Sequence, residues 1–73
     1  MDIKVKIGHR IKELRKKIGI SQEALANQAE VDRTYVTDVE NGRRNVSVKI
    51  LERLIKALNA SFADFFDSKE FKK

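Results

Sequence analysis

Apolar residues recur every three to four positions in five segments of the chain, the spacing of one buried face of an α-helix. The first segment carries Ile7, Ile11, Leu14 and Ile18. Two shorter segments follow, with Leu25, Ala26 and Ala29 in one and Val36 and Val39 in the other. The fourth segment has the broadest stripe, made of Ile50, Leu51, Leu54, Ile55 and Leu58, and the fifth carries Phe62, Phe65 and Phe66. The pattern predicts an all-α fold of five helices.

Polar residues between these segments are of the types that begin and end helices. Helices are predicted to begin at the N-capping residues Ser21, Asp32, Ser47 and Ser61, the last of which forms a capping box with Asp64. They are predicted to end at Gly19, Asn41–Gly42 and Asn59. We therefore expect one domain over residues 1–73 with its core in 7–66. Residues 1–5 and 68–73 are expected to be frayed ends, although Ile3, Val5 and Phe71 could pack.

The amino-acid composition excludes several classes of function. The 73 residues include no cysteine, which excludes disulfides, thiol catalysis and cysteine-based zinc sites. His9 is the only histidine and no glycine-rich phosphate loop exists, so we expect no metal, no cofactor and no enzyme. A secreted domain this small would usually carry disulfides. We therefore expect the protein in the cytoplasm, associated with the nucleoid and not with a membrane.

Charge is unevenly distributed along the chain. The net charge of +5 would attract nucleic acid or an acidic membrane surface. Residues 21–41, however, contain five acidic groups and one basic residue, Arg33. The positive charges lie on both sides of this segment, at Arg10, Lys12, Arg15, Lys16, Lys17, Arg43, Arg44, Lys49, Arg53 and Lys56. A clamp on DNA phosphates must therefore come from the flanking segments.

Residues 21–42 form the most informative stretch, two short amphipathic helices joined by a tight turn. Two helices at this spacing are the unit that places the second helix in the DNA major groove. Small Ala26 falls where the two helices cross most closely. With Val36 and Val39 turned inward, the outward face of the second helix consists of Arg33, Thr34, Thr37, Asp38 and Asn41.

With these features the chain resembles the lambda-repressor/Cro-type (XRE) helix-turn-helix family over residues 7–66. The resemblance rests on GISQEALA, VDRTYVTDVENG and LIKALNASFADFF. Within the family, the chain is most similar to the controller proteins of restriction–modification systems, as indicated by DRTYV followed by RRNVSVKILERLIKAL. Phage and plasmid repressors share these sequence motifs. The family usually has glycine where this chain has Glu30, and a non-glycine residue in the left-handed region costs about 1 kcal/mol.

The resemblance implies a homodimer that regulates transcription by binding a pseudo-palindromic operator. A controller protein would activate at low concentration and repress at high concentration. A Cro-like repressor of a phage or plasmid is the nearest alternative. A second alternative, from another class, is an antitoxin-like protein-interaction module that uses the acidic surface of residues 21–41.

Candidate base contacts lie on the second helix of the unit: Arg33, Thr34, Thr37 and Tyr35. Arg33 can pair with O6 and N7 of guanine, or it can remain a solvated surface residue. The Tyr35 hydroxyl can also reach phosphate or sugar. Asp38 can accept a hydrogen bond from cytosine N4, but repulsion from phosphates is the reading that we favour.

The remaining site residues follow from the resemblance. Phosphate contacts are expected from Gln22, Arg43, Arg44, Asn45, Ser47 and Lys49, with Ser47 also acting as a cap. Arg15 and Glu40 are expected to form a partly buried ion pair. The dimer interface is expected at Phe62, Phe65 and Phe66, of which one or two can instead fill the core. Glu23 is a candidate contact for an RNA polymerase sigma factor, or it is simply a carboxylate favoured at a helix N-terminus.

Overall fold

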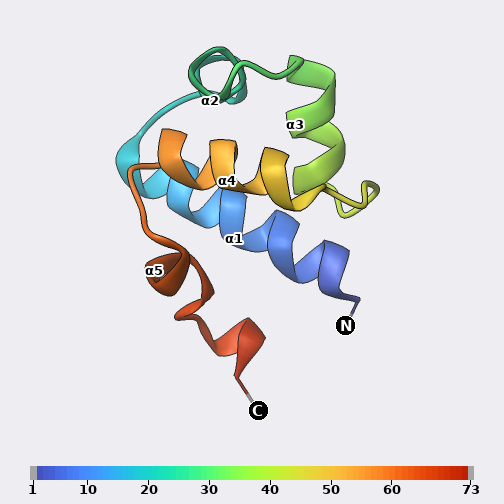
Figure 1. The fold of residues 1–73 in the computed structure, drawn as a ribbon, viewed down its shortest axis with the longest axis vertical. Helices are drawn as coiled ribbons and strands as arrows, with labels where there is room; N and C mark the ends of the chain where they lie inside the picture. Colours follow the sequence, from blue (N-terminus) through green and yellow to red (C-terminus); the bar gives the residue numbers. More distant parts are fainter. Residues whose placement is uncertain (1, 73) are drawn as a thin grey trace.

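The structure, a computed structural model, describes residues 2–72 and contains five α-helices followed by a short 3-10 turn (Figure 1). The helices are α1 (Ile3–Ile18), α2 (Gln22–Ala29), α3 (Arg33–Glu40), α4 (Val48–Ala57) and α5 (Phe62–Phe66), and the 3-10 turn is η1 (Lys69–Phe71). The predicted all-α, five-helix fold is confirmed. Within residues 2–72, no helix is long and apolar enough to cross a membrane.

The helix beginnings follow from local sequence. The Oγ atoms of Ser21, Ser47 and Ser61 each accept a hydrogen bond from the backbone N–H three residues further on, at 3.0 to 3.1 Å. Each bond satisfies one of the amide groups that have no partner inside the helix. Asp32 occupies the N-cap position of α3 without a side-chain hydrogen bond.

Left-handed residues end four of the helices. Gly19 has φ 77°, Glu30 has φ 58°, Gly42 has φ 73° and Asn59 has φ 59°. Glu30 therefore adopts the conformation that glycine usually provides at this turn, and its backbone N–H still donates to Asn27 O at 3.2 Å. The turn between α2 and α3 keeps its geometry in spite of the larger side chain.

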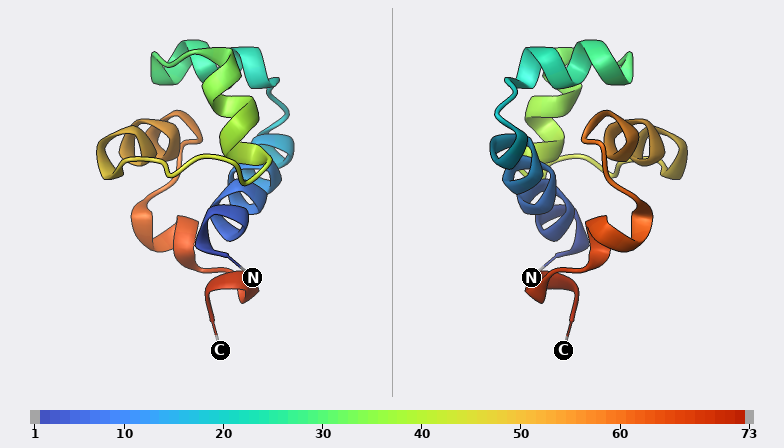
Figure 2. Two further views of the ribbon diagram at one scale, coloured as in Figure 1. Left: turned by 90° about the vertical axis from the view of Figure 1, so that its right-hand side faces the viewer. Right: turned by 90° about the vertical axis from the view of Figure 1, so that its left-hand side faces the viewer.

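One core joins α1, α2, α3 and α4, with α5 packed against α4 (Figure 2). Its buried apolar members are Ile11, Leu25, Ala26, Ala29, Val36, Val39, Leu51, Leu54, Ile55, Leu58 and Phe65. All of them come from the predicted apolar stripes. Two members of the predicted stripes are exposed: Ile18, at the last turn of α1, by 45%, and Phe62, at the start of α5, by 42%.

Helix α1 passes close to the C-terminal end of α3 at Gly8. A Cβ atom at this position would lie 2.9 Å from the carbonyl oxygen of Glu40 and closer still to that of Val39. No side chain fits in this space without moving backbone. Glycine is therefore required here for space, at a position where it weakens the helix by about 1 kcal/mol relative to alanine.

The predicted fraying of residues 1–5 is wrong for residues 3–5, which form the first turn of α1. Asp2 caps this turn, since its Oδ1 atom accepts a hydrogen bond from the backbone N–H of Lys4 at 2.8 Å. Val5 is half-buried and its side chain lies against Gly42. Met1 lies outside the described residues.

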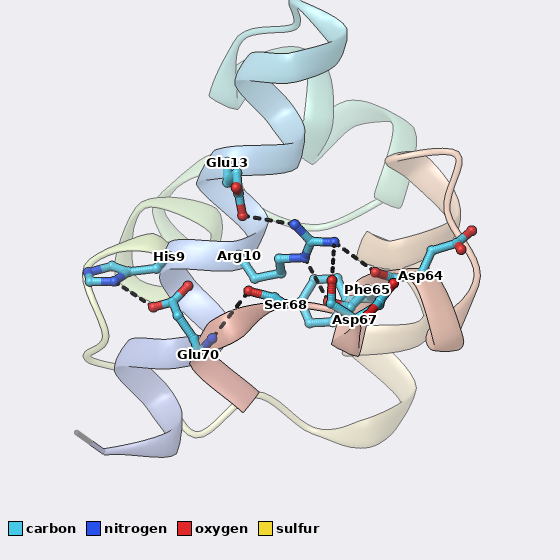
Figure 3. A network of polar contacts seen from close by, with 8 residues as sticks. All are labelled: His9, Arg10, Glu13, Asp64, Phe65, Asp67, Ser68 and Glu70. Atoms are coloured by element: carbon cyan, nitrogen blue, oxygen red, sulfur yellow. Dashed lines mark hydrogen bonds and ion pairs between the residues drawn. The ribbon is translucent and has the colours of Figure 1, made fainter. Parts of the chain in front are cut away.

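The C-terminal segment is also more ordered than predicted, because it returns to α1 (Figure 3). The Phe71 ring packs edge-on against Phe66, with 4.8 Å between ring centroids. Arg10 donates from Nε to the carbonyl oxygen of Phe65 and from Nη2 to that of Asp64, both at 2.7 Å. The Arg10 bonds hold α5 against α1, and Phe71 packs on α5, so residues 69–71 lie against the fold. Lys73 lies outside the described residues.

His9 also contributes to this contact. Its Nδ1 atom lies 3.0 Å from Oε1 of Glu70, and the backbone N–H of Glu70 donates to Ser68 Oγ at 3.4 Å (Figure 3). The histidine side chain is 51% exposed. It therefore lies at the surface and also faces the C-terminal turn.

Candidate nucleic-acid interface

Helices α2 and α3 lie at the end of the molecule opposite to the C-terminus (Figures 1 and 2). Helix α3 turns Val36 and Val39 into the core and leaves Arg33 and Thr34 exposed in its first turn. Tyr35 is half-buried beside them. In a recognition helix the first turn is the part that meets base edges, and Arg33 and Thr34 occupy that turn of α3.

A buried polar network fixes α3 from its inner side. Arg15 donates from Nε to Oε2 of Glu40 at 2.7 Å and from Nη2 to Oε1 at 3.0 Å, while its Nη1 donates to Ile20 O at 2.9 Å. Glu40 is only 5% exposed. The hydrogen bond with Glu40 raises the pKa of Arg15 above its ordinary value. The expected ion pair is present, and it joins the last turn of α1 to the last residue of α3.

Two of the predicted DNA contacts belong to the same network. Gln22 Nε2 donates to Oε1 of Glu40 at 3.1 Å, and Thr37 Oγ1 donates to Oε1 of Gln22 at 3.1 Å. The amide of Gln22 carries a second N–H, which leaves one donor for a phosphate. The Thr37 hydroxyl proton points toward the protein, so its methyl group and oxygen lone pair are what α3 can present there.

Tyr35, Arg44 and Asp38 form a second cluster at the outer side of α3. The Arg44 guanidinium carbon lies 4.4 Å above the centroid of the Tyr35 ring, a cation–π arrangement. Nη2 of Arg44 lies 3.5 Å from Oδ2 of Asp38, and Nη1 of Arg43 lies 3.9 Å from Oδ1. The two arginines expected to bind phosphate are thus gathered against α3 by one carboxylate.

The loop after α3 and the start of α4 hold the other predicted phosphate contacts. Asn45, Ser47 and Lys49 are all exposed. Ser47 caps α4 by accepting a hydrogen bond from the backbone N–H of Ile50 at 3.1 Å. The hydroxyl and the free amide groups of this first turn form a polar edge beside the Arg43–Arg44 pair, and such helix N-termini favour anions.

The phenylalanines of α5 do not all lie at the surface. Phe65 is fully buried, with 0% of its surface exposed, so its predicted place in a dimer interface is wrong. It fills the core because Arg10 and Phe71 hold α5 with this side inward. Phe62 is 42% exposed and Phe66 is half-buried. The aromatic surface available for a partner is therefore Phe62 with part of Phe66.

Sequence reasoning missed the links between the predicted site residues. Residues 38 and 44 lie on either side of a helix end, so no helical period relates Asp38 to Arg44. The pairing of Gln22 with Glu40 likewise crosses between two helices. The one available signal was Asp38 itself, an acidic residue on the helix side predicted to face DNA and six positions before a basic residue. Among residues 2–72, no group of three or more acidic or histidine side chains converges as a metal site would require.

Comparison with known proteins agrees with this geometry. A family model described as helix-turn-helix matches residues 11–65. The chain is 43% identical over 70 residues to the control protein C.MunI of Mycoplasma sp, a match covering 94% of this chain and 95% of that one. The structure is similar to that of the restriction-modification controller protein C.AhdI from Aeromonas hydrophila, with a TM-score of 0.83, 44% identity, and coverage of 86% of this chain and 96% of that one.

A third similar structure is the restriction-modification controller protein C.Esp1396I, solved as a tetramer in complex with its natural 35 base-pair operator. The TM-score is 0.91 at 36% identity, and the match covers 100% of this chain and 99% of that one. The resemblance noted in the sequence is thus confirmed by a family model and by relatives aligned over nearly their full length. The protein belongs to the XRE-type helix-turn-helix family.

Proposed function

We propose that the protein is a sequence-specific transcriptional regulator that binds an operator as a homodimer and controls a restriction–modification system. The main support is the near full-length similarity to controller proteins together with an α3 whose first turn leaves Arg33 and Thr34 exposed. Such a protein works where the DNA is, in the cytoplasm. As a controller it activates at low concentration and represses at high concentration.

In this proposal α3 enters the major groove with its first turn leading. Arg33 pairs with O6 and N7 of a guanine, and Thr34 contacts a neighbouring base or a thymine methyl group. Tyr35 and the methyl group of Thr37 contact the edges of the same half-site. The buried pair of Arg15 and Glu40 holds the helix at a fixed angle during this docking.

Phosphate contacts come from both sides of α3. The free N–H of Gln22 and the N-terminus of α2 approach one backbone strand. On the other side, the groups that bind phosphate are Arg43, Arg44, Asn45, Ser47 and Lys49. These contacts set the register of the protein on DNA and supply most of the salt-dependent affinity.

The homodimer places two copies of α3 in successive major grooves, roughly 34 Å apart, and so reads a pseudo-palindrome. Its interface is formed around Phe62 and the exposed part of Phe66, since Phe65 is occupied in the core. For the activating mode we include Glu23 as the contact for a sigma factor. Its support is limited to its exposed position in the first turn of α2.

The test is selection of binding sites from random DNA at two salt concentrations, followed by affinity measurements with Arg33→Ala. We expect a palindrome with one-turn spacing between half-sites. Losing one bidentate base contact should weaken operator binding roughly 5- to 150-fold and leave sequence-blind binding nearly unchanged. The control is Arg53→Ala, which removes the same charge from an exposed position on α4. It should change operator binding and sequence-blind binding equally. Equal loss on both DNAs with Arg33→Ala would refute its role in base reading.

A further inference from the structure

Asp38 anchors the loop that carries the two arginines. Its backbone carbonyl accepts a hydrogen bond from the N–H of Arg43 at 2.9 Å, and its carboxylate faces both guanidinium groups. The side chain of Asp38 is 29% exposed, whereas those of Arg44 and Arg43 are 45% and 71% exposed. The carboxylate is therefore the least accessible member of the group, and the arginines close over it from the solvent side.

We propose that Asp38 is a specificity-determining residue, because its carboxylate competes with DNA phosphates for the Arg44 guanidinium. The inference rests on the proposed function and adds a reason for the unusual charge on α3. On DNA that lacks the operator sequence, Arg44 stays with Asp38 and contributes little to affinity. On the operator, base contacts seat α3 deeply enough for a phosphate to replace the carboxylate.

The geometry suits an exchange of partners rather than a permanent pair. The single contact between Arg44 and Asp38 measures 3.5 Å, longer than the 2.7 Å bond between Arg15 and Glu40. Charge-assisted hydrogen bonds are strongest below about 2.9 Å, so the Arg44 pair is weak. The Tyr35 ring keeps the guanidinium close to α3 whichever anion it faces. Arg44 is thus positioned for phosphate while its charge is already balanced.

The competition predicts how the affinities for operator and non-operator DNA change when the Asp38 charge is removed. Affinity is measured from the free protein, in which Arg44 is already paired with Asp38. Binding the operator therefore includes the cost of breaking that pair, and removing the Asp38 charge should raise operator affinity by this whole cost. On DNA where Arg44 keeps its partner no such cost arises, so the gain there should be smaller and comes only from the attraction of a free guanidinium for phosphate. The ratio of the two affinities, which is the specificity, should therefore rise when the Asp38 charge is removed.

The experiment compares Asp38→Asn with the wild-type protein on an operator duplex and on a scrambled duplex, over a series of salt concentrations. Removing a unit charge about 4 Å from its partner in water corresponds to about a fivefold gain on the operator duplex, with a smaller gain on the scrambled duplex. The slope of log affinity against log salt should steepen by about 0.9 on the scrambled duplex, the value for one additional phosphate, and stay nearly unchanged on the operator. A purely structural role of Asp38 would not steepen this slope. Glu52→Gln, at an exposed position on α4, makes the same change in net charge and should not alter the specificity ratio.

Repeating the Asp38→Asn substitution in two arginine variants shows which arginine the carboxylate competes for. In Arg44→Ala the effect of Asp38→Asn should disappear, whereas in Arg43→Ala it should persist, because Arg43 lies farther from the carboxylate at 3.9 Å. Persistence in the Arg44→Ala background would show general repulsion of phosphates and would overturn the competition. Thermal melting of each variant checks that the fold is retained.

Other outcomes are equally decisive. An unchanged specificity ratio with Asp38→Asn would overturn the inference while leaving the proposed function intact. A loss of operator affinity confined to one base position would make Asp38 a direct base contact, which also overturns it. A wild-type protein that prefers no sequence would instead overturn the proposed function itself.

Discussion

Replacing Arg15 by methionine tests whether the buried ion pair holds the recognition helix. Methionine keeps an unbranched side chain of similar reach but removes the charge and all its donors. In the structure Glu40 receives hydrogen bonds from Nε and Nη2 of Arg15 and from Nε2 of Gln22. After the substitution, the carboxylate would remain buried with Gln22 as its partner.

The expected loss of stability is large for so small a domain. Removing one partner of a buried ion pair costs about 3–5 kcal/mol. We expect about 3 kcal/mol, the lower end of that range, because the Arg15 side chain is 11% exposed and water can reach its site. A chain of 73 residues has a total stability of roughly 4–11 kcal/mol. The melting temperature should fall by roughly 12–24 °C.

The assay is urea unfolding followed by far-UV circular dichroism, with thermal melting as the second measurement. The matched variant combines Arg15→Met with Glu40→Leu, since two apolar side chains leave no uncompensated charge. This double variant should recover most of the loss, because replacing a whole buried pair by apolar residues is often neutral or stabilising. A cost below about 1 kcal/mol for Arg15→Met, the value typical of exposed pairs, would refute the reasoning. Absence of recovery in the double variant would do the same.

Two other predictions follow from the structure. Gly8→Ala should destabilise the fold in urea unfolding, because the new methyl group would meet backbone carbonyls of α3. This loss should exceed the helix propensity of alanine, which favours the variant by about 1 kcal/mol. A variant as stable as the wild type, or more stable, would contradict the packing. The hydrogen bond from the Lys72 ammonium to Asp67 lowers the pKa of that carboxyl, so Lys72→Gln should raise the Asp67 pKa toward its ordinary value in a carbon NMR titration. A lowered folded-state pKa stabilises the protein above the unfolded-state value and ceases to do so as pH falls through the folded-state value. The variant should therefore lose that small stabilisation at neutral pH and not in strong acid; an unmoved Asp67 pKa would contradict the pair.

The helices could be predicted because their signals are local. A serine cap needs only the amide three residues further on, and Gly19 and Asn59 end helices through their own backbone conformation. The apolar stripes likewise identified the core, because each stripe repeats with the period of its own helix. The same helical period predicted that Arg33 is exposed, because it lies on the outward face of the helix when Val36 and Val39 turn inward.

Features that depend on contacts between distant segments could not be predicted. Nothing near Phe65 in sequence distinguishes it from Phe62, and the choice of the buried ring depends on Arg10 and Phe71. The order of the C-terminal turn depends on contacts with α1 made more than fifty residues away in the chain. The pairing of Asp38 with the arginines depends on the path of a loop, which no periodicity describes.

The anchoring of α3 by Arg15 and Glu40 has a consequence for how such proteins diverge. The inner side of the helix carries the stability of the fold, while Arg33 and Thr34 in its first turn carry none of the buried contacts. Under the proposed function, substitutions at those two positions would therefore change the preferred operator without endangering the fold. A duplicated gene could acquire a new target through a few codons, and an engineer could transplant the outward residues of a relative onto this scaffold.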